Sequence, residues 1–367
     1  MTAWSDALDR MRGRVSRTAA SAPAGFPHFA DPATGAWTCS PGGDWTGGFW
    51  TGMLWLTAKG TGEAAVRRWA EAWTERLRPR AESDTVFRGF LFYYGGALGD
   101  ILLDDPLGRE VGLLGAKALA ASYNPRAEAL PLGSEAEEAS DVGRGEANID
   151  TVQAAALLLW ASRHTGDGTL REVAVRHARR HVELCLRDDD SVCQSASFDP
   201  ASGAMRRRYT HKGITDDSTW ARAQAWGILG WTLTAQWSGD LAFLAPARRA
   251  ADWWLAHAPA DRVAFWDFDD PAIPAATRDT SATAIVAASL LKLAALVPPP
   301  AASRYREAAE ATASALVERH LGADGMLRDG CYNKRIGLAT RHELIWGSYY
   351  LYEALHVLAS RLDPLTV

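Results

Sequence analysis

Five side chains with distinct chemistry stand close to the starts of apolar segments in this 367-residue chain: Trp45, Phe87, Asp150, Lys212 and Arg222. A carboxyl group can transfer a proton, lysine and arginine bind anions, and aromatic rings can stack on the faces of sugars. The chain also has 16 tryptophans, and an excess of tryptophan on loops and helix ends suits such stacking. These residue types could transfer a proton, bind an anion and stack on a ring in one site, provided that the fold brings them together.

The elements that must position these residues are about twelve helix-like segments, which alternate in character along the chain. One set is amphipathic and charged, with apolar residues three or four positions apart. It covers residues 5–19, 63–78, 106–122, 169–186, 242–257 and 303–320. The other set is apolar almost all round, which is typical of buried helices. It covers residues 48–59, 90–103, 149–165, 218–236, 280–297 and 345–362.

Six charged and six apolar helices predict an all-α fold, an (α/α)6 barrel formed as a single domain by residues 1–367. An open helical solenoid is the alternative, although solenoid repeats usually resemble one another in sequence and these segments do not. One short β-hairpin is predicted at residues 193–198 and 205–210, around a turn-forming cluster at 199–203. Residues 133–147 are predicted to form a long loop. In such a barrel, the loops that lead into the inner helices gather at one mouth.

Composition and charge exclude several functional classes. A net charge of −5 without a basic block argues against a nucleic-acid binder. No apolar stretch is long enough for a transmembrane helix, and residues 1–20 contain no signal-peptide core, so no membrane partner is expected. The cysteines match no CxxC pattern and favour a reducing compartment; they are Cys39, Cys185, Cys193 and Cys331. No nucleotide, nucleophile-elbow or zinc motif occurs, so neither a cofactor nor a metal is expected, and the oligomeric state is not indicated.

Five groups of motifs span nearly the whole chain. They are DWTGGFWTG at 44–52, NIDT at 148–151, THKG at 210–213 with DDSTWARAQAW at 216–226, WDFDDP at 266–271 with RDTS at 278–281, and IWGSYY at 345–350. In this order they resemble the unsaturated glucuronyl hydrolases, glycoside hydrolase family 88. The resemblance implies an (α/α)6 barrel in the cytoplasm. It also implies removal of a 4,5-unsaturated uronic acid from a lyase-generated oligosaccharide.

By this resemblance, Asp150 occupies the position of the family's catalytic acid. The family's substrate is a vinyl ether: the acid protonates C4, water adds at C5, and the resulting hemiketal opens. The acid must therefore hold a proton near neutral pH, which burial or a neighbouring carboxylate can achieve. Asp150 could instead only cap the helix that begins near it, a common role for aspartate.

The resemblance also places Trp45 at a stacking position and Arg222 and Trp226 at substrate-binding positions. Arg222 could hold the uronate carboxylate in a bidentate pair, or it could form a buried ion pair with Asp216 or Asp217. Trp226 could be a sugar platform or part of the core. His211 could donate to a sugar hydroxyl, although a structural role is favoured. The other histidines, His177, His181, His257 and His320, are expected mostly on solvated helix faces.

The chain departs from the family pattern at four positions. The family carries a second essential aspartate in a His-Asp-x-Gly-Phe segment, and Phe87 stands in its place within residues 86–90. Gln194 stands where the family has a histidine, Lys212 where it has a glutamine, and Gly133 near a family tryptophan. Alternatively, Asp84 could move in to replace the missing carboxylate. The acidic run Glu135, Glu137 and Glu138 is interpreted as a solvated loop that could act as a lid.

Because Phe87 removes a carboxylate while Arg88 and Lys212 add cations, the pocket is expected to be less acidic and more cationic than the family's. Nearby cations would hold Asp150 ionised, which suits a general base. The candidate catalytic residue is Asp150. The candidate substrate-binding residues are Trp45, Phe87, Arg88, Gln194, His211, Lys212, Arg222 and Trp226.

Three functions remain open at this point. The first is an unsaturated uronyl hydrolase-like enzyme that acts on an anionic sugar or sugar-derived small molecule. The second is an enzyme on the same scaffold that carries out hydration, dehydration or cyclisation of a specialised metabolite, because fold does not fix function. The third is a non-catalytic sugar-binding protein.

Overall fold

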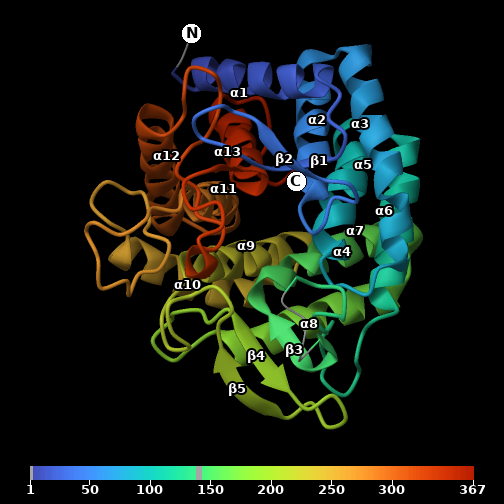
Figure 1. The fold of residues 1–367 in the computed structure, drawn as a ribbon. Helices are drawn as coiled ribbons and strands as arrows, with labels where there is room; N and C mark the ends of the chain where they lie inside the picture. The colour runs from blue at the N-terminus through green and yellow to red at the C-terminus, as the bar shows by residue number, and fades with distance from the viewer. Residues whose placement is uncertain (1–2, 138–142) are drawn as a thin grey trace.

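The computed structural model describes residues 3–137 and 143–367, and in this part of the chain the helices form an outer and an inner set (Figure 1). The outer helices are α1 (Ala3–Ala20), α3 (Ala64–Leu77), α6 (Pro106–Ala120), α8 (Gly168–Cys185), α10 (Leu244–His257) and α12 (Ala301–Arg319). The inner helices are α2 (Gly47–Thr61), α4 (Arg88–Phe92) with α5 (Leu98–Leu103), α7 (Ala154–Thr165), α9 (Ala221–Ser238), α11 (Thr280–Leu296) and α13 (Ile345–Leu358).

The inner helices close into a ring. Each one contacts the next along the chain, and α13 returns to contact α2. Glycines permit close approach: a Cβ on Gly48 of α2 would lie 2.3 Å from the carbonyl oxygen of Phe90, and one on Gly89 would lie 2.7 Å from Cα of Ala154. The closed ring confirms the predicted (α/α)6 barrel and is inconsistent with an open solenoid.

Burial follows the sequence patterns that distinguish the two sets. In the inner helix α9, every residue from Ala221 to Ala235 is buried. In the outer helix α3, only one face is buried, formed by Val66, Ala70, Trp73, Thr74 and Leu77. Removal of apolar surface from water is the main force that sorts such segments, so composition alone separates inner from outer helices.

The second inner segment is not one continuous helix. A π-helical turn, η2 (Tyr93–Ala97), separates α4 from α5. The carbonyl oxygen of Gly95 in this turn accepts hydrogen bonds from Trp55 Nε1 at 3.2 Å and Thr74 Oγ1 at 2.6 Å. These side chains from α2 and α3 use a carbonyl that the wider turn makes available.

The predicted hairpin is confirmed as β4 (Ser195–Phe198) and β5 (Met205–Tyr209), and β3 (Glu146–Asn148) extends it to three strands. The predicted loop at 133–147 therefore ends in structure, with η3 (Gly143–Gly145) before β3. A second sheet was not predicted from the sequence. It consists of β2 (Trp37–Ser40), β1 (Phe26–Ala30) and β6 (Glu343–Leu344), and it joins segments from opposite ends of the chain.

Short helices complete the described part of the chain: η1 (Arg78–Glu82), η4 (Ile149–Gln153), η5 (Leu241–Phe243) and η6 (Lys334–Ile336). Both η4 and β6 lead directly into inner helices, α7 and α13. They therefore lie at the barrel end where the inner helices begin. No described helix is long and apolar enough to cross a membrane. All four cysteines are free thiols.

Candidate active site

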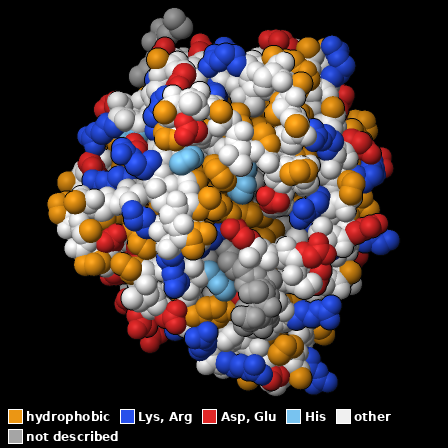
Figure 2. Space-filling view, viewed as in Figure 1, with side chains coloured by type: hydrophobic (Ala, Val, Ile, Leu, Met, Phe, Trp, Pro, Cys, Tyr) orange, Lys and Arg blue, Asp and Glu red, His pale blue; other side chains and the backbone are white. Residues whose placement is uncertain are grey.

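A cavity of about 450 Å³ lies at the barrel end where the inner helices begin, a size suited to a small-molecule ligand. Figure 2 shows apolar side chains in a hollow near the centre of this face, with charged side chains and histidines around it. The lining residues come from the segments before α2, α4, η4 and α13. They are His28, Phe29, Asp44, Trp45, Arg80, Thr85, Phe87, Glu135, Ala136, Glu137, Tyr332 and Leu338.

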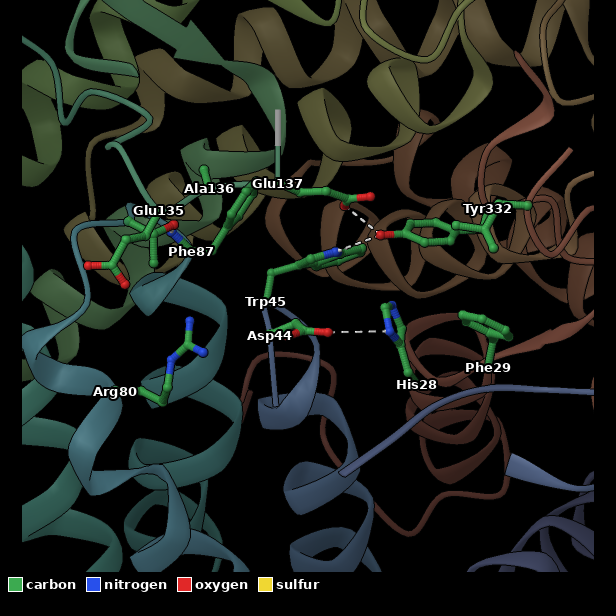
Figure 3. Close-up of a pocket in the computed structure, with 12 residues that line it drawn as sticks. His28, Phe29, Asp44, Trp45, Arg80, Phe87, Glu135, Ala136, Glu137 and Tyr332 are labelled. Carbon is green, nitrogen blue, oxygen red and sulfur yellow. Dashed lines mark hydrogen bonds and ion pairs between the residues drawn. The ribbon is translucent and has the colours of Figure 1, made fainter. Parts of the chain in front are cut away.

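Trp45 forms one wall of the cavity just before α2. Its ring packs against Trp346 at a centroid distance of 4.7 Å and against Phe87 at 5.9 Å. Its Nε1 donates a hydrogen bond to the hydroxyl of Tyr332 at 3.3 Å (Figure 3). This bond fixes the orientation of two aromatic rings that come from opposite ends of the chain.

Lys212 lies against the same two rings. Its ammonium is 4.7 Å from the ring centroid of Tyr332 and 5.9 Å from that of Trp45, distances typical of cation–π contacts. The Lys212 side chain is only 4% exposed, and its Nζ lies 3.3 Å from Oε2 of Glu137. The structure thus brings Lys212 and Trp45 together, as the sequence predicted.

Gln194 and His211 support the loop that carries Lys212. The amide oxygen of Gln194 accepts hydrogen bonds from Thr210 Oγ1 and from the backbone N–H groups of His211 and Lys212, at 2.8 to 2.9 Å. Nε2 of His211 lies 2.7 Å from Oε1 of the buried Glu146. Neither side chain is among the residues that line the cavity. For His211 this agrees with the structural role that the sequence favoured. For Gln194 the structure shows a supporting contact where substrate binding was predicted.

Asp150 lies on η4, and its exposed fraction is only 6%. The N-cap of this helix is Asn148, whose side chain accepts a hydrogen bond from the backbone N–H of Asp150 at 3.1 Å. The capping role considered for Asp150 is therefore wrong, because its neighbour performs it. Asp150 lies at the same barrel end as Lys212 but is not among the residues that line the cavity.

Two buried histidines of α8 support the segment that carries Asp150. His177 Nε2 bonds to the carbonyl oxygen of Thr151 at 2.9 Å, and His177 Nδ1 accepts from the backbone N–H of Leu130 at 3.1 Å. Nδ1 of His181 bonds to the carbonyl oxygen of His177 at 2.8 Å. The expectation of solvated faces is wrong for this pair. Burial lowers the pKa of His177, and it lowers that of His181 to about 4, so both rings are neutral at pH 7.

Arg222 lies in the interior instead of the cavity. Its guanidinium pairs with Asp279 at 2.7 Å and donates to the carbonyl oxygens of Cys331 and Tyr332. The expected ion pair exists, but Asp279 takes the place of Asp216 or Asp217. Arg222 therefore positions the backbone of Tyr332, and the structure does not place it where it could bind a ligand in this cavity.

Trp226 belongs to the core beneath the site. It is buried, with its ring 5.0 Å from Phe90 and 5.7 Å from Tyr350. Phe90 in turn stacks on Phe87, which does line the cavity. Of the two roles considered for Trp226, the structure favours the core.

This architecture and much of its sequence are shared with characterised proteins. The unsaturated glucuronyl hydrolase of Bacillus sp. (strain GL1) is 36% identical over 363 residues, which cover 96% of each chain. The chain belongs to the unsaturated glucuronyl hydrolases, glycoside hydrolase family 88. The unsaturated chondroitin disaccharide hydrolase of Streptococcus pyogenes serotype M1 is 30% identical over 323 residues, which cover 85% of this chain and 80% of the relative. No protein-family model matches the chain.

Solved structures agree with this assignment to the unsaturated glucuronyl hydrolases. The crystal structure of the Bacillus sp. GL1 enzyme superimposes with a TM-score of 0.91 at 34% identity, over 97% of this chain and 96% of that one. A variant of an unsaturated glucuronyl hydrolase with dGlcA-Glc-Rha-Glc gives the same values. A heparin-specific unsaturated glucuronyl hydrolase gives a TM-score of 0.90 at 26% identity, covering 98% of both chains.

Phe87, which the sequence pattern predicts to stand in place of the family's second aspartate, lines the cavity wall. Its ring stacks on Phe90 with an interplanar angle of 11°. Asp84 does not replace the missing carboxylate in the cavity, because its Oδ2 accepts hydrogen bonds from the backbone N–H and hydroxyl of Ser134 at 3.1 and 2.7 Å. Asp84 lines a separate cavity on the surface.

That the site is less acidic and more cationic than the family's stays a prediction, but Arg88 does not contribute to it. Arg88 turns away from the cavity, and its guanidinium donates to the carbonyl oxygens of Thr85 and Ala81 at 2.9 and 3.1 Å. Lys212 is paired with Glu137. The described lining contains three carboxylates, Asp44, Glu135 and Glu137, and one arginine, Arg80. Asp44 points toward His28 and Glu137 toward the hydroxyl of Tyr332 (Figure 3).

Among the ionisable residues of the lining, sequence reasoning missed three: His28, Arg80 and Tyr332. Asp44 lies 3.6 Å from His28, and burial lowers the pKa of this histidine. None of the three stands in a motif, so the sequence offered no signal for them. Glu137 was singled out only as part of an acidic run. Within that run, Glu135 accepts from the backbone N–H of Asp84, and Glu138 lies outside the described residues.

Among the described residues, no cluster of three or more His, Cys, Asp or Glu side chains could hold a metal ion.

Proposed function

We propose that this protein hydrolyses a 4,5-unsaturated uronide and that Asp150 transfers the proton. The observation that carries the proposal is the placement of Lys212 on the aromatic wall formed by Trp45 and Tyr332. This wall lies at the same barrel end as Asp150. An ammonium on an aromatic wall can hold a carboxylate while a ring stacks on the sugar. Supporting this, relatives over most of the chain are named for hydrolysis of unsaturated glucuronyl and chondroitin substrates.

In the proposed reaction, the carboxyl group of Asp150 gives a proton to C4 of the vinyl ether, and the oxygen of a water molecule bonds to C5. The proton lost by that water returns to the Asp150 carboxylate, so the net change is addition of water across the C4=C5 bond. The resulting hemiketal opens and releases the aglycone. This scheme needs one proton-transfer group and differs from the two-carboxylate scheme of most glycosidases.

Phe87 supports an alternative in which the same scaffold catalyses another reaction on a sugar-derived molecule. The alternative is hydration, dehydration or cyclisation, without release of an aglycone. The observation in its favour is the phenyl ring in the wall, stacked on Phe90, with Asp84 bound elsewhere. A non-catalytic sugar-binding role is the third candidate.

The test follows the ultraviolet absorbance of the C4=C5 bond during incubation of an unsaturated disaccharide with the protein. Hydrolysis at ordinary enzyme rates, about 1 per second or faster, together with release of the second sugar, would support the proposal. Loss of absorbance without release of a sugar would favour the alternative. Binding without any loss of absorbance would favour the third candidate.

A further inference from the structure

The hydroxyl of Tyr332 is the meeting point of a short hydrogen-bond chain in the cavity. It receives a hydrogen bond from Trp45 Nε1 and donates its own proton to Oε2 of Glu137 (Figure 3). Burial raises the pKa of Tyr332, so the hydroxyl remains a donor near neutral pH. The backbone of Tyr332 is held by Arg222 from below. The phenol is thus fixed at both ends.

The same oxygen of Glu137 also lies 3.3 Å from the ammonium of Lys212. One carboxylate oxygen therefore accepts from both an ammonium and a phenol, and the ammonium lies over the face of Trp45. Burial raises the pKa of Glu137, but the charge of Lys212 and the hydrogen bonds from Tyr332 and Lys212 outweigh burial and hold that pKa below its usual value. Glu137 is therefore ionised near neutral pH.

We infer that Lys212 and Tyr332 form the seat for the substrate's carboxylate, and that Glu137 occupies this seat until the substrate displaces it. The inference rests on the proposed function, because a uronide substrate carries a carboxylate. A donor pair that holds one ionised carboxylate can hold another of the same geometry. Glu137 thus acts as an internal competitor.

Exposure distinguishes the fixed part of the seat from the exchangeable part. The side chain of Lys212 is 4% exposed, whereas that of Glu137 is 35% exposed and lines the open cavity. Glu137 can turn into water without being left buried and charged. Lys212 stays buried against the rings of Trp45 and Tyr332, so its ammonium keeps its place when Glu137 turns out.

With competition of this kind, the apparent affinity for a carboxylate ligand is the intrinsic affinity multiplied by the fraction of molecules in which Glu137 has left the seat. If Glu137 fills the seat in about nine of ten molecules, its removal strengthens carboxylate binding about tenfold. The experiment measures the dissociation constant of D-glucuronate by calorimetry for the wild type, Glu137→Gln and Glu137→Ala. Glu318→Gln on α12 is the matched control, because it removes one negative charge from an exposed outer helix whose carboxylate accepts from Ser314.

The expected result is about tenfold tighter glucuronate binding by both Glu137 variants, no change for Glu318→Gln, and loss of the gain when Lys212→Met is added. Unchanged or weaker binding by the Glu137 variants would overturn the inference. Glu137→Gln and Glu137→Ala are both measured, so that a local folding defect in one of them does not decide the result. Thermal unfolding tests whether each variant is folded.

This binding measurement does not depend on turnover, so it separates failure of the inference from failure of the proposed hydrolysis. If the wild type also hydrolyses an unsaturated disaccharide, Glu137→Gln should lower KM and preserve kcat. A large fall in kcat with an unchanged glucuronate dissociation constant would instead make Glu137 a participant in the chemistry and would overturn the competitor role.

Discussion

The amide oxygen of Gln194 accepts a hydrogen bond from the backbone N–H of Lys212 at 2.9 Å. The sequence pattern predicts that the chain departs from its family at both of these residues. Their contact shows that these two positions, although separated in sequence, meet in one loop. The amide oxygen of Gln194 also accepts from the backbone N–H of His211 and the hydroxyl of Thr210. One oxygen therefore organises the loop that holds Lys212 against Trp45 and Tyr332 of the cavity wall.

Removal of this amide should loosen the loop. We expect Gln194→Ala to destabilise the protein by about 2 kcal/mol, because the buried N–H of Lys212 and the partly buried N–H of His211 lose their acceptor. The KM for an anionic substrate should rise because Lys212 loses its fixed position. Chemical denaturation and steady-state kinetics measure the two effects. Gln236→Ala is the control, since that amide donates to Leu365 and Val367 at the other end of α9; an equal KM for both variants would contradict the prediction.

Asp150→Asn should abolish turnover and leave the melting temperature almost unchanged, because Asn148 caps η4. Asn148→Ala should instead lower the free energy of unfolding by about 0.5–2 kcal/mol, because η4 loses its N-cap. Thermal unfolding and the absorbance assay on both variants distinguish the proton-transfer role from a structural one. Retention of turnover by Asp150→Asn would remove Asp150 from the mechanism.

Phe87→Asp should weaken the site. The change removes an apolar wall and buries a carboxylate beside Phe90 and Trp45. Lost apolar contact and new desolvation of about 1–3 kcal/mol correspond to a fall in kcat/KM of about fivefold to a hundredfold.

Phe87→Leu keeps an apolar wall and should retain most of the activity. If Phe87→Asp instead hydrolyses an unsaturated uronide faster than the wild type, the ring is an obstacle to hydrolysis. That result would favour recruitment of the wild-type scaffold to another reaction.

Stability should fall on mild acidification because of the buried histidines of α8. The pKa of His181 is lowered from 6.5 to about 4 by burial, so below pH 6.5 the unfolded chain binds a proton that the folded protein does not. The contribution of neutral His181 to the free energy of unfolding is fully present above pH 6.5. It is lost progressively as the pH falls from 6.5 towards 4. For His181 alone, the loss between pH 7.5 and pH 5 is about 2 kcal/mol.

Urea unfolding of the wild type and of His181→Gln at these two pH values tests this linkage. The variant should be less stable at pH 7.5 but should lose less stability on acidification, by roughly the same 2 kcal/mol. His177 shifts in the same direction and keeps its own contribution in the variant. Parallel pH dependences for the two proteins would contradict the assigned protonation of His181.

Local composition determined the barrel. Segments that are apolar on all faces can only be stable inside, and segments with one apolar face can only cover them, so the outer and inner helices were predictable with near-correct bounds. The turn cluster at 199–203 placed the hairpin in the same local way. Trp45 and Phe87 precede inner helices, and that position alone placed them at the mouth.

Only the tertiary structure decided which polar groups meet. Arg222 lies in the first turn of α9, and Asp279 caps the neighbouring inner helix α11 at the same barrel end. This packing, and not proximity in sequence to Asp216, sets the ion pair. Glu137 and Tyr332 meet across the cavity for the same reason, as do β1 and β6. Hydrophobic burial has no preferred direction, so it can be predicted from local composition. Hydrogen bonds and ion pairs require two atoms within about 3 Å of each other. For residues far apart in sequence, closure of the helix ring decides which atoms come that close.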